Sequence, residues 1–195
     1  MKNDQPNFAH ISQEPGQEQW LRRYYFIRTA FSAVWVAAAF TIGRQSSEIG
    51  SILLVMYPAW DALANYIDAS RSGGLGRNRT QTINVVVSSA TTLAVVLALT
   101  MSMNWVIGVF GVWAVLSGLL QLGTAARRWK SYGAQWAMIL SGAQSALAGS
   151  FFIVQAQMPM PPSITNVAGY AAVGAFYFLV SAMWLTVSQM RRRAI

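Results

Sequence analysis

The chain has 195 residues, of which 54% are hydrophobic and only 10% are charged. Soluble domains average about 25% charged residues, so this composition excludes an ordinary soluble protein. The net charge of +8 would suit nucleic-acid binding only if the basic side chains formed a patch on a polar domain. Cysteine is absent, which excludes disulfides, iron–sulfur clusters, thiol catalysis and zinc sites with cysteine ligands.

The first 20 residues are polar and aperiodic, and they include Pro6, Pro15 and Gly16. This composition predicts a disordered cytoplasmic tail over residues 1–20, followed by one folded domain over residues 21–193. A secretory signal is not expected, because the segment is weakly basic and the first apolar run begins too late.

Two long stretches carry no charge, residues 80–126 and residues 131–190. A membrane-spanning helix needs about 20 mostly apolar residues, so each stretch can hold two spans. Turn signals divide both stretches: a polar segment at 100–104 in the first, and three prolines within 159–162 in the second.

Two less regular apolar segments precede these stretches. Residues 29–43 form a short uncharged run between two arginines, and residues 49–67 are apolar apart from a few polar positions. With both counted as spans, the sequence predicts an all-α, polytopic transmembrane bundle of six helices, at about residues 25–43, 49–69, 82–101, 105–125, 134–155 and 165–189. Consecutive helices would form three tandem helical hairpins, at about residues 25–69, 82–125 and 134–189.

The basic residues test this count of spans. With the N-terminus in the cytoplasm, all but one of the 14 Lys and Arg residues fall in cytoplasmic segments, and the exception is Arg44. The positive-inside rule therefore predicts a multi-pass membrane protein with both ends in the cytoplasm. The expected partners are the lipid bilayer and, for the basic glycine-rich loop 72–79, anionic headgroups on the cytoplasmic side. Nucleic acid is not expected as a partner, and a homo-oligomer is compatible with the apolar surface.

A weak pattern recurs in the second, fourth and sixth predicted helices, where it begins at Trp60, Trp113 and Tyr177. Each copy starts with an aromatic residue, ends in two small or short residues, and is followed by a cytoplasmic arginine 11 or 14 residues after the aromatic. This spacing favours tandem repeats that enter the membrane from the same side.

The middle of the chain resembles a known family. The residues that carry the resemblance are 111–122 (GVWAVLSGLLQL), the arginine pair at 127 and 128, and 136–142 (WAMILSG). On these residues the chain resembles the HdeD-like short-repeat membrane proteins, whose repeat is a domain of unknown function. The resemblance implies a bacterial inner-membrane protein of six helices in three hairpins. The family's namesake is associated with acid resistance at high cell density, and the family supplies no catalytic motif.

Asp61 is the one acidic residue deep in a predicted span. Tyr57, Asn65 and Asp68 share its helix face at spacings of three and four residues. A charge in hydrocarbon costs about 2.5–3.5 kcal/mol, so this face should point into the bundle. Two interpretations stay open. Asp61 is either a proton or cation site, or a structural carboxylate that is bonded to Tyr57 and Asn65 and paired with Arg28.

Two weaker patterns involve small and sulfur-containing side chains. Helix five carries Ser141, Gly142, Ser145 and Gly149 at spacings that favour close helix packing. Two Met-x-Met pairs lie in the loops expected outside, and they consist of Met101 with Met103 and Met158 with Met160. Thioethers suit Cu(I), so these pairs are either a metal site or simply apolar interface residues.

Catalysis has little support in the sequence. The only histidine, His10, lies in the tail, and there is no paired carboxylate, His or Cys metal cluster, or phosphate-binding loop. We therefore expect no enzyme activity and no cofactor. The expected function is that of a non-enzymatic integral inner-membrane protein of the HdeD-like family with a stress-related role. The alternative is a small-solute or proton-coupled transporter with Asp61 at its site.

Overall fold

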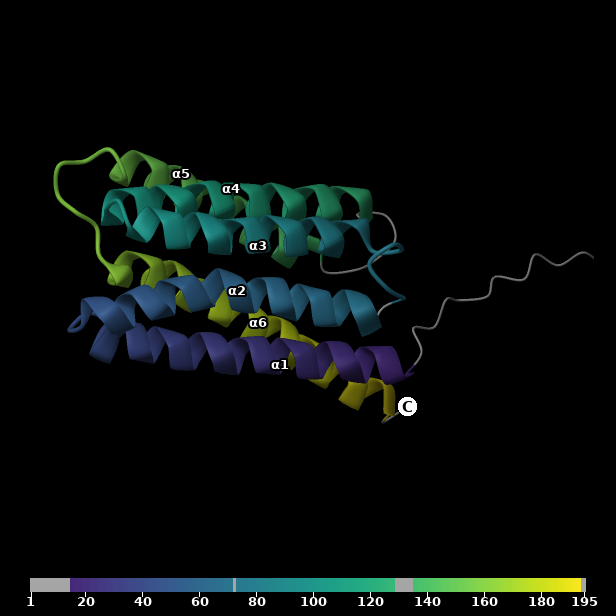
Figure 1. The fold of residues 1–195 in the computed structure, drawn as a ribbon. Helices are drawn as coiled ribbons and strands as arrows, with labels where there is room; N and C mark the ends of the chain where they lie inside the picture. The colour runs from purple at the N-terminus through teal and green to yellow at the C-terminus, as the bar shows by residue number, and fades with distance from the viewer. Residues whose placement is uncertain (1–14, 72, 129–134, 194–195) are drawn as a thin grey trace, which may run out of the picture.

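The computed structural model describes residues 15–71, 73–128 and 135–193, and over these residues the chain is helical without any strand. Six α-helices lie side by side along a common direction, with loops at both ends (Figure 1). The elements are α1 (Pro15–Ala38), the short π-helix η1 (Ala39–Gly43), α2 (Ser47–Arg71), α3 (Arg79–Leu99), α4 (Met103–Arg128), α5 (Gln135–Gln155) and α6 (Ile164–Arg193).

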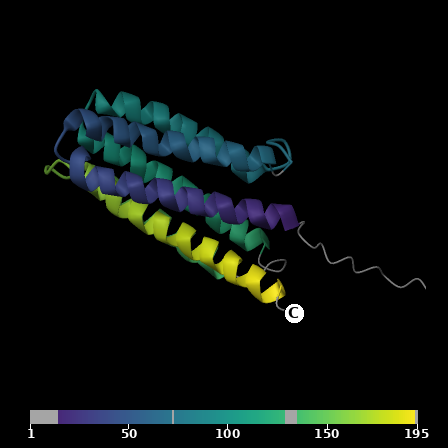
Figure 2. The same cartoon turned by 90° about the horizontal axis from the view of Figure 1, so that it is seen from below.

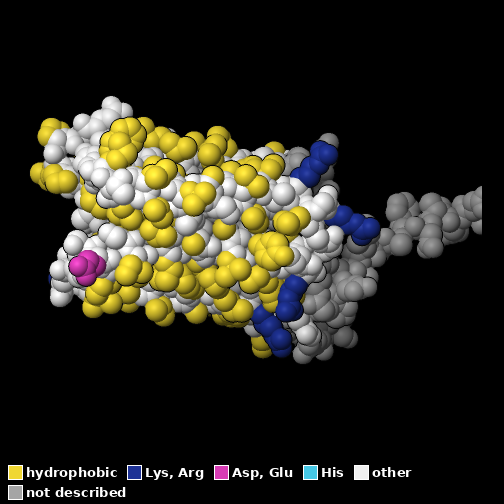
Figure 3. Space-filling model, in the orientation of Figure 1, with side chains coloured by type: hydrophobic (Ala, Val, Ile, Leu, Met, Phe, Trp, Pro, Cys, Tyr) yellow, Lys and Arg dark blue, Asp and Glu magenta, His cyan; other side chains and the backbone are white. Residues whose placement is uncertain are grey.

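Four of these helices are long and apolar enough to cross a membrane. They are Gln19–Gly43, which continues through η1, Arg79–Leu99, Met103–Gly123 and Ile164–Arg191. The apolar part of α5, Ile139–Gln155, is shorter, and α2 has the length but carries several polar residues. Apolar side chains cover the middle of the face drawn in Figure 3, and Lys and Arg gather at one end. The chain is therefore a multi-pass membrane protein.

Helix α1 begins at Pro15, earlier than the sequence suggested. The predicted disordered tail is therefore wrong for residues 15–20, while residues 1–14 lie outside the described part of the chain. Proline suits a first helical turn, because an N–H there would have no partner within the helix.

Trp20, one turn further along α1, holds this part of the helix against α2. The Arg71 guanidinium lies 4.3 Å from the centre of its ring, and its indole donates to Asp68 at 3.2 Å.

The most closely packed pairs are α4 with α5, α2 with α3, and α1 with α6. Helix α3 also packs on α4, so α2 to α5 form one continuous wall that the pair α1 and α6 closes. The backbones of the consecutive helices α1 and α2, and likewise of α5 and α6, come close at few points, although η1 packs on α2 and aromatic side chains of α1 and α2 pack against one another. We call these two sparse contacts the α1/α2 seam and the α5/α6 seam. The structure does not confirm the three predicted hairpins as packing units.

Glycines bring α4 and α5 together. Gly111 and Gly118 on α4 lie opposite Gly149 and Gly142 on α5, and both pairs are spaced by seven residues. A Cβ at Gly118 would lie 2.5 Å from the Gly142 carbonyl oxygen, and one at Gly149 would lie 2.5 Å from that of Gly111. Small residues allow helices to approach this closely in a membrane. The close packing predicted for the small residues of α5 is thus present, and α4 is the partner.

The two ends of the bundle differ in charge. The end formed by the start of α1, the α2–α3 connection and the end of α6 is called the basic end. The exposed arginines there are Arg23, Arg71, Arg77, Arg79 and Arg191. At the opposite end, which we call the distal end, Gly50 lies against η1, so that a Cβ on it would be 2.8 Å from the Gly43 carbonyl oxygen.

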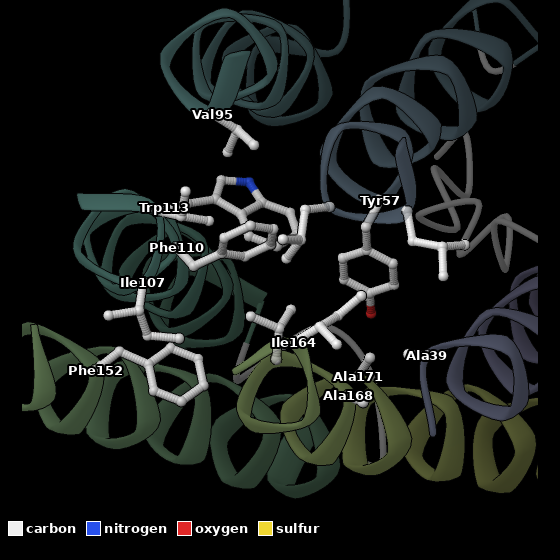
Figure 4. Packing of buried hydrophobic residues seen from close by; sticks show 14 of the residues in the cluster. Ala39, Tyr57, Val95, Ile107, Phe110, Trp113, Phe152, Ile164, Ala168 and Ala171 are labelled. Carbon is white, nitrogen blue, oxygen red and sulfur yellow. The ribbon is translucent and has the colours of Figure 1, made fainter. Parts of the chain in front are cut away.

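The buried apolar core occupies the distal half of the bundle, where the six helices surround it (Figure 4). Its members come from the later part of α1, α3 and α5 and from the early part of α2, α4 and α6. The largest fully buried side chains include Trp35, Leu54, Val95, Ile107 and Phe110. The distal half is therefore closed by close-packed apolar side chains, which leaves polar residues to the half near the basic end.

Replacing Gly118 by alanine should destabilise the protein by about 1–3 kcal/mol, the usual cost of overpacking. The added methyl group would meet backbone on α5, which cannot rotate away. The measurement is the midpoint of thermal unfolding in detergent, followed by circular dichroism. Gly169→Ala is the matched control, because a Cβ there meets nothing within 4 Å; alanine favours the helix, so its midpoint should not fall. A Gly118→Ala midpoint at or above wild type would contradict the packing described.

Candidate functional site

An ion pair joins α1 to α2 inside the bundle. The guanidinium of Arg28 binds the Asp61 carboxylate through Nη2 and Oδ1, as the structural interpretation of Asp61 predicted. The two side chains are 12% and 14% exposed, so both charges are largely withdrawn from the surroundings. A charge buried in an apolar environment is tolerated when it is paired and hydrogen-bonded. This pair also bridges the sparse α1/α2 seam.

The second oxygen of Asp61 is held by neutral donors. Asn65 donates to Oδ2 at 3.0 Å from the same helix, as predicted, and the Ser88 hydroxyl of α3 donates at 2.7 Å. Ser88 in turn accepts from the Trp113 indole N–H at 3.1 Å. The network therefore extends from α1 through α2 and α3 to α4. Sequence reasoning did not single out Ser88 as the hydroxyl that reaches Asp61, because it is one of several hydroxyls on its helix.

Arg28 has two further partners besides Asp61. Its Nη1 donates to the Tyr24 hydroxyl at 2.9 Å, and its guanidinium carbon lies 4.4 Å from the centre of the Phe178 ring on α6. A guanidinium over an aromatic face is attracted by the ring quadrupole, most strongly where water is excluded. The ion pair and its ring contact therefore connect α1, α2 and α6.

Tyr57 differs from its prediction. No hydrogen bond joins it to Asp61 among the described residues, and its hydroxyl interacts with Ser32 instead. Its ring packs 4.6 Å from that of Trp35 and meets Trp113 edge to face at 5.8 Å. The residue lies on the predicted face but belongs to the boundary between the apolar core and the polar region.

Asp68 lies on the same face, nearer the basic end. It is only 7% exposed, yet within the described residues no basic side chain forms an ion pair with it. Its hydrogen bonds come from neutral groups, the Trp20 indole at 3.2 Å and the Gln81 amide at 3.4 Å. A buried carboxylate without a cation is costly, which makes Asp68 the least compensated charge described in the site.

A cavity of about 310 Å³, lined by both polar and aromatic side chains, connects these residues. All five predicted site residues line it, and every one of the six helices contributes to its wall. The lining includes Gln81 at the start of α3, Gln121 near the end of α4, and Gln144 on α5, so the cavity lies toward the basic end. Figure 2 shows α6 diverging from α2 and α3 toward the end that carries the C-terminus.

The floor of the cavity is the boundary of the apolar core. Tyr57 and Trp113 belong to the core and line the cavity, and Tyr170, which packs against the core and meets Trp113 edge to face at 6.3 Å, lines it too. Ser145 donates to the Ala114 carbonyl at 2.9 Å, so its other contact, at 2.8 Å, is a bond donated by the Tyr170 hydroxyl. This bond bridges the α5/α6 seam. Each sparse seam thus carries buried polar contacts: the Ser145–Tyr170 bond at the α5/α6 seam, and at the α1/α2 seam the Arg28–Asp61 pair and a 2.8 Å bond from the Trp35 indole to the Leu53 carbonyl.

The two Met-x-Met loops do lie together at the distal end. The Asn104 amide donates to the carbonyls of Ala156 and Met158 at 3.1 and 2.9 Å, which ties the α3–α4 turn to the α5–α6 loop. Met101 and Met160 are 59% and 80% exposed. These bonds from the Asn104 side chain hold the two loops together without a metal, so the copper hypothesis for Met101, Met103, Met158 and Met160 remains a prediction.

Comparison with family models, curated proteins and solved structures found no match for this chain. The resemblance to the HdeD-like proteins therefore stays a prediction from residues 111–142.

Replacing Asp61 by asparagine should destabilise the protein by about 3–5 kcal/mol, because it leaves the buried Arg28 charge unpaired. The double variant Asp61→Asn with Arg28→Gln should recover part of this loss, since it removes both charges. Unfolding midpoints in detergent measure both effects, and Arg44→Gln, which removes an exposed arginine, serves as control. A double variant whose loss of stability relative to wild type equals the sum of the losses in Asp61→Asn and Arg28→Gln alone would show that the pair is not coupled.

Proposed function

We propose that this protein is a non-enzymatic, multi-pass protein of the inner membrane that belongs to the HdeD-like family. In this proposal all six helices cross the bilayer as three tandem hairpins, and both ends lie in the cytoplasm. The support is the concentration of arginines at the basic end, which the positive-inside rule assigns to the cytoplasmic face. Helix α2 crosses despite its polar residues, because they point into the bundle and find partners there.

We further propose that the protein transports a small polar solute, and that the cavity is its binding site. The observation that supports this proposal is the cavity itself, which has a volume of about 310 Å³, contains charged and polar groups in its wall, and is lined by all six helices. Its volume lies at the lower end of ligand-binding cavities in proteins, which indicates a small solute. Polar groups inside a membrane protein are costly to maintain, and a bundle that needed only stability would fill this space with apolar side chains.

The arrangement resembles one end state of an alternating-access carrier. The cavity lies toward the basic end, while close-packed side chains seal the distal half. The α1/α2 and α5/α6 seams divide the bundle into two bodies, the α1–α6 pair and the wall of α2 to α5. Rocking of one body against the other would exchange the polar contacts at the two seams. These are the Ser145–Tyr170 bond at the α5/α6 seam and, at the α1/α2 seam, the Arg28–Asp61 pair and the bonds from Trp20 to Asp68 and from Trp35 to the Leu53 carbonyl.

Proton coupling through Asp61 receives less support than solute binding. Its carboxylate is occupied by Arg28, Asn65 and Ser88, so a proton would have to displace an ion pair. Asp61 fits better as a residue that holds the two bodies together at the floor of the cavity.

Proteoliposomes test the proposal by osmotic light scattering with glycerol, lactate and butylammonium chloride as probes of three charge classes. At least one probe should cross faster than in protein-free vesicles, and Ser117→Trp should slow it at least tenfold by filling the cavity. Ser150→Trp, on the exposed face of α5, should leave the rate unchanged. Equal rates for all three probes with and without protein would overturn transport of small solutes.

A further inference from the structure

The charges that line the cavity do not cancel. Of its lining residues only three are ionisable at neutral pH: Arg28 carries +1, and Asp61 and Asp68 carry −1 each. The sum, +1 − 2 = −1, leaves one negative charge in the described wall. Since Arg28 and Asp61 neutralise each other, the excess charge resides on Asp68. A low-dielectric cavity concentrates such a field and raises the local concentration of cations.

The free hydrogen-bonding capacity of the cavity also suits a donor. Asp68 receives only two long bonds from neutral groups, although a carboxylate can accept about four. The Gln121 Oε1 atom is buried and has no partner among the described residues. Arg71 lies over the Trp20 ring rather than on Asp68. The cavity therefore presents unfilled acceptors to a ligand that carries positive charge and N–H groups.

The described cavity wall offers an anion no basic group that corresponds to Asp68. Arg28 is the only basic residue that lines the described cavity, and its two terminal nitrogens bind Tyr24 and Asp61 while Phe178 covers its face. Binding an anion would require breaking a buried ion pair. The electrostatics thus favour a cation over an anion or a neutral solute.

Aromatic rings distinguish an organic cation from a metal ion. The seven aromatic residues in the lining are Tyr24, Tyr25, Tyr57, Trp113, Tyr170, Tyr177 and Phe178. Aromatic faces attract organic cations and pack against their alkyl groups, whereas hard metal ions require several oxygen ligands. Arg28 shows that this lining already holds one organic cation by its rings, at 4.4 Å from Phe178 and 5.7 Å from Tyr24.

We propose that the cavity binds a small alkylammonium ion, with its ammonium group on Asp68 and its alkyl part against the aromatic lining. The assignment rests on the proposed function, because it names the class of solute that the transporter would carry. Asp68, near the end of α2 at the basic end, would be the first charge that such a solute meets on entry from that side. Asp61, already paired, would play no direct part in recognition.

Isothermal titration of the full chain in nanodiscs tests the assignment with butylammonium and its neutral counterpart 1-butanol, against empty nanodiscs. Butylammonium should bind and 1-butanol should not. Asp68→Asn should weaken binding at least tenfold, Asp68→Glu should retain it, and Glu48→Gln, exposed at the distal end, should have no effect. Equal binding of the two probes, unchanged affinity in Asp68→Asn, or displacement by an equal concentration of K⁺ would overturn the proposal.

A second pair of variants keeps the test decisive should Asp68→Asn fail to fold. Tyr177→Leu removes an aromatic face from the lining and should weaken butylammonium binding, whereas Tyr177→Phe keeps the face and should not. Identical affinities in both variants would remove the aromatic part of the proposal. The two proposals fail separately. Flux of glycerol or lactate without butylammonium binding would overturn only the proposed class of solute. Binding of butylammonium without any flux would overturn only the proposed transport.

Discussion

The structure depends on the requirement that a charge inside a membrane must find its partner within the protein. Arg28 and Asp61 meet this requirement through each other, and Ser88, Tyr24 and Phe178 complete their surroundings. These contacts come from α1, α2, α3 and α6, so satisfying two charges fixes the relative positions of four helices. Polar contacts specify an arrangement that apolar packing alone would not, because lipid competes equally well for apolar surface.

The same requirement divides the bundle into two halves. Apolar side chains and the reciprocal glycine contacts of α4 and α5 pack the distal half and one wall. The polar residues gather in the other half, around a cavity that no helix fills. Close contacts join α2 to α5 into one wall, and α1 and α6 attach to it through the shared apolar core in the distal half and through polar contacts at the two seams. A carrier needs a rigid body, a second body and a polar space between them. Here these are the wall of α2 to α5, the α1–α6 pair and the cavity.

Much of this was predictable from where the charges are placed. Uncharged stretches located the helices to within a few residues, except at α1, and helical spacing placed Tyr57, Asp61 and Asp68 on one face. The Arg28–Asp61 pair followed from two charges entering from the same side at similar depth. Which helices pack together was not predictable from the sequence. Each helix is apolar on all sides, so hydrophobicity does not distinguish the face that contacts lipid from the face that contacts protein. The Ser88 contact and the excess charge of Asp68 depend on that pairing, so they required the structure.

The central claim is that a polar cavity opens toward the basic end and is sealed at the distal end. The chain contains no cysteine, so single cysteines can be introduced without other changes. Ser117→Cys, in the cavity wall, should react with a charged, membrane-impermeant maleimide in inside-out vesicles and stay unlabelled in right-side-out vesicles. Ser150→Cys, on the outer face of α5, should stay unlabelled in both. Labelling of Ser117→Cys from the outside alone, or from neither side, would contradict the account.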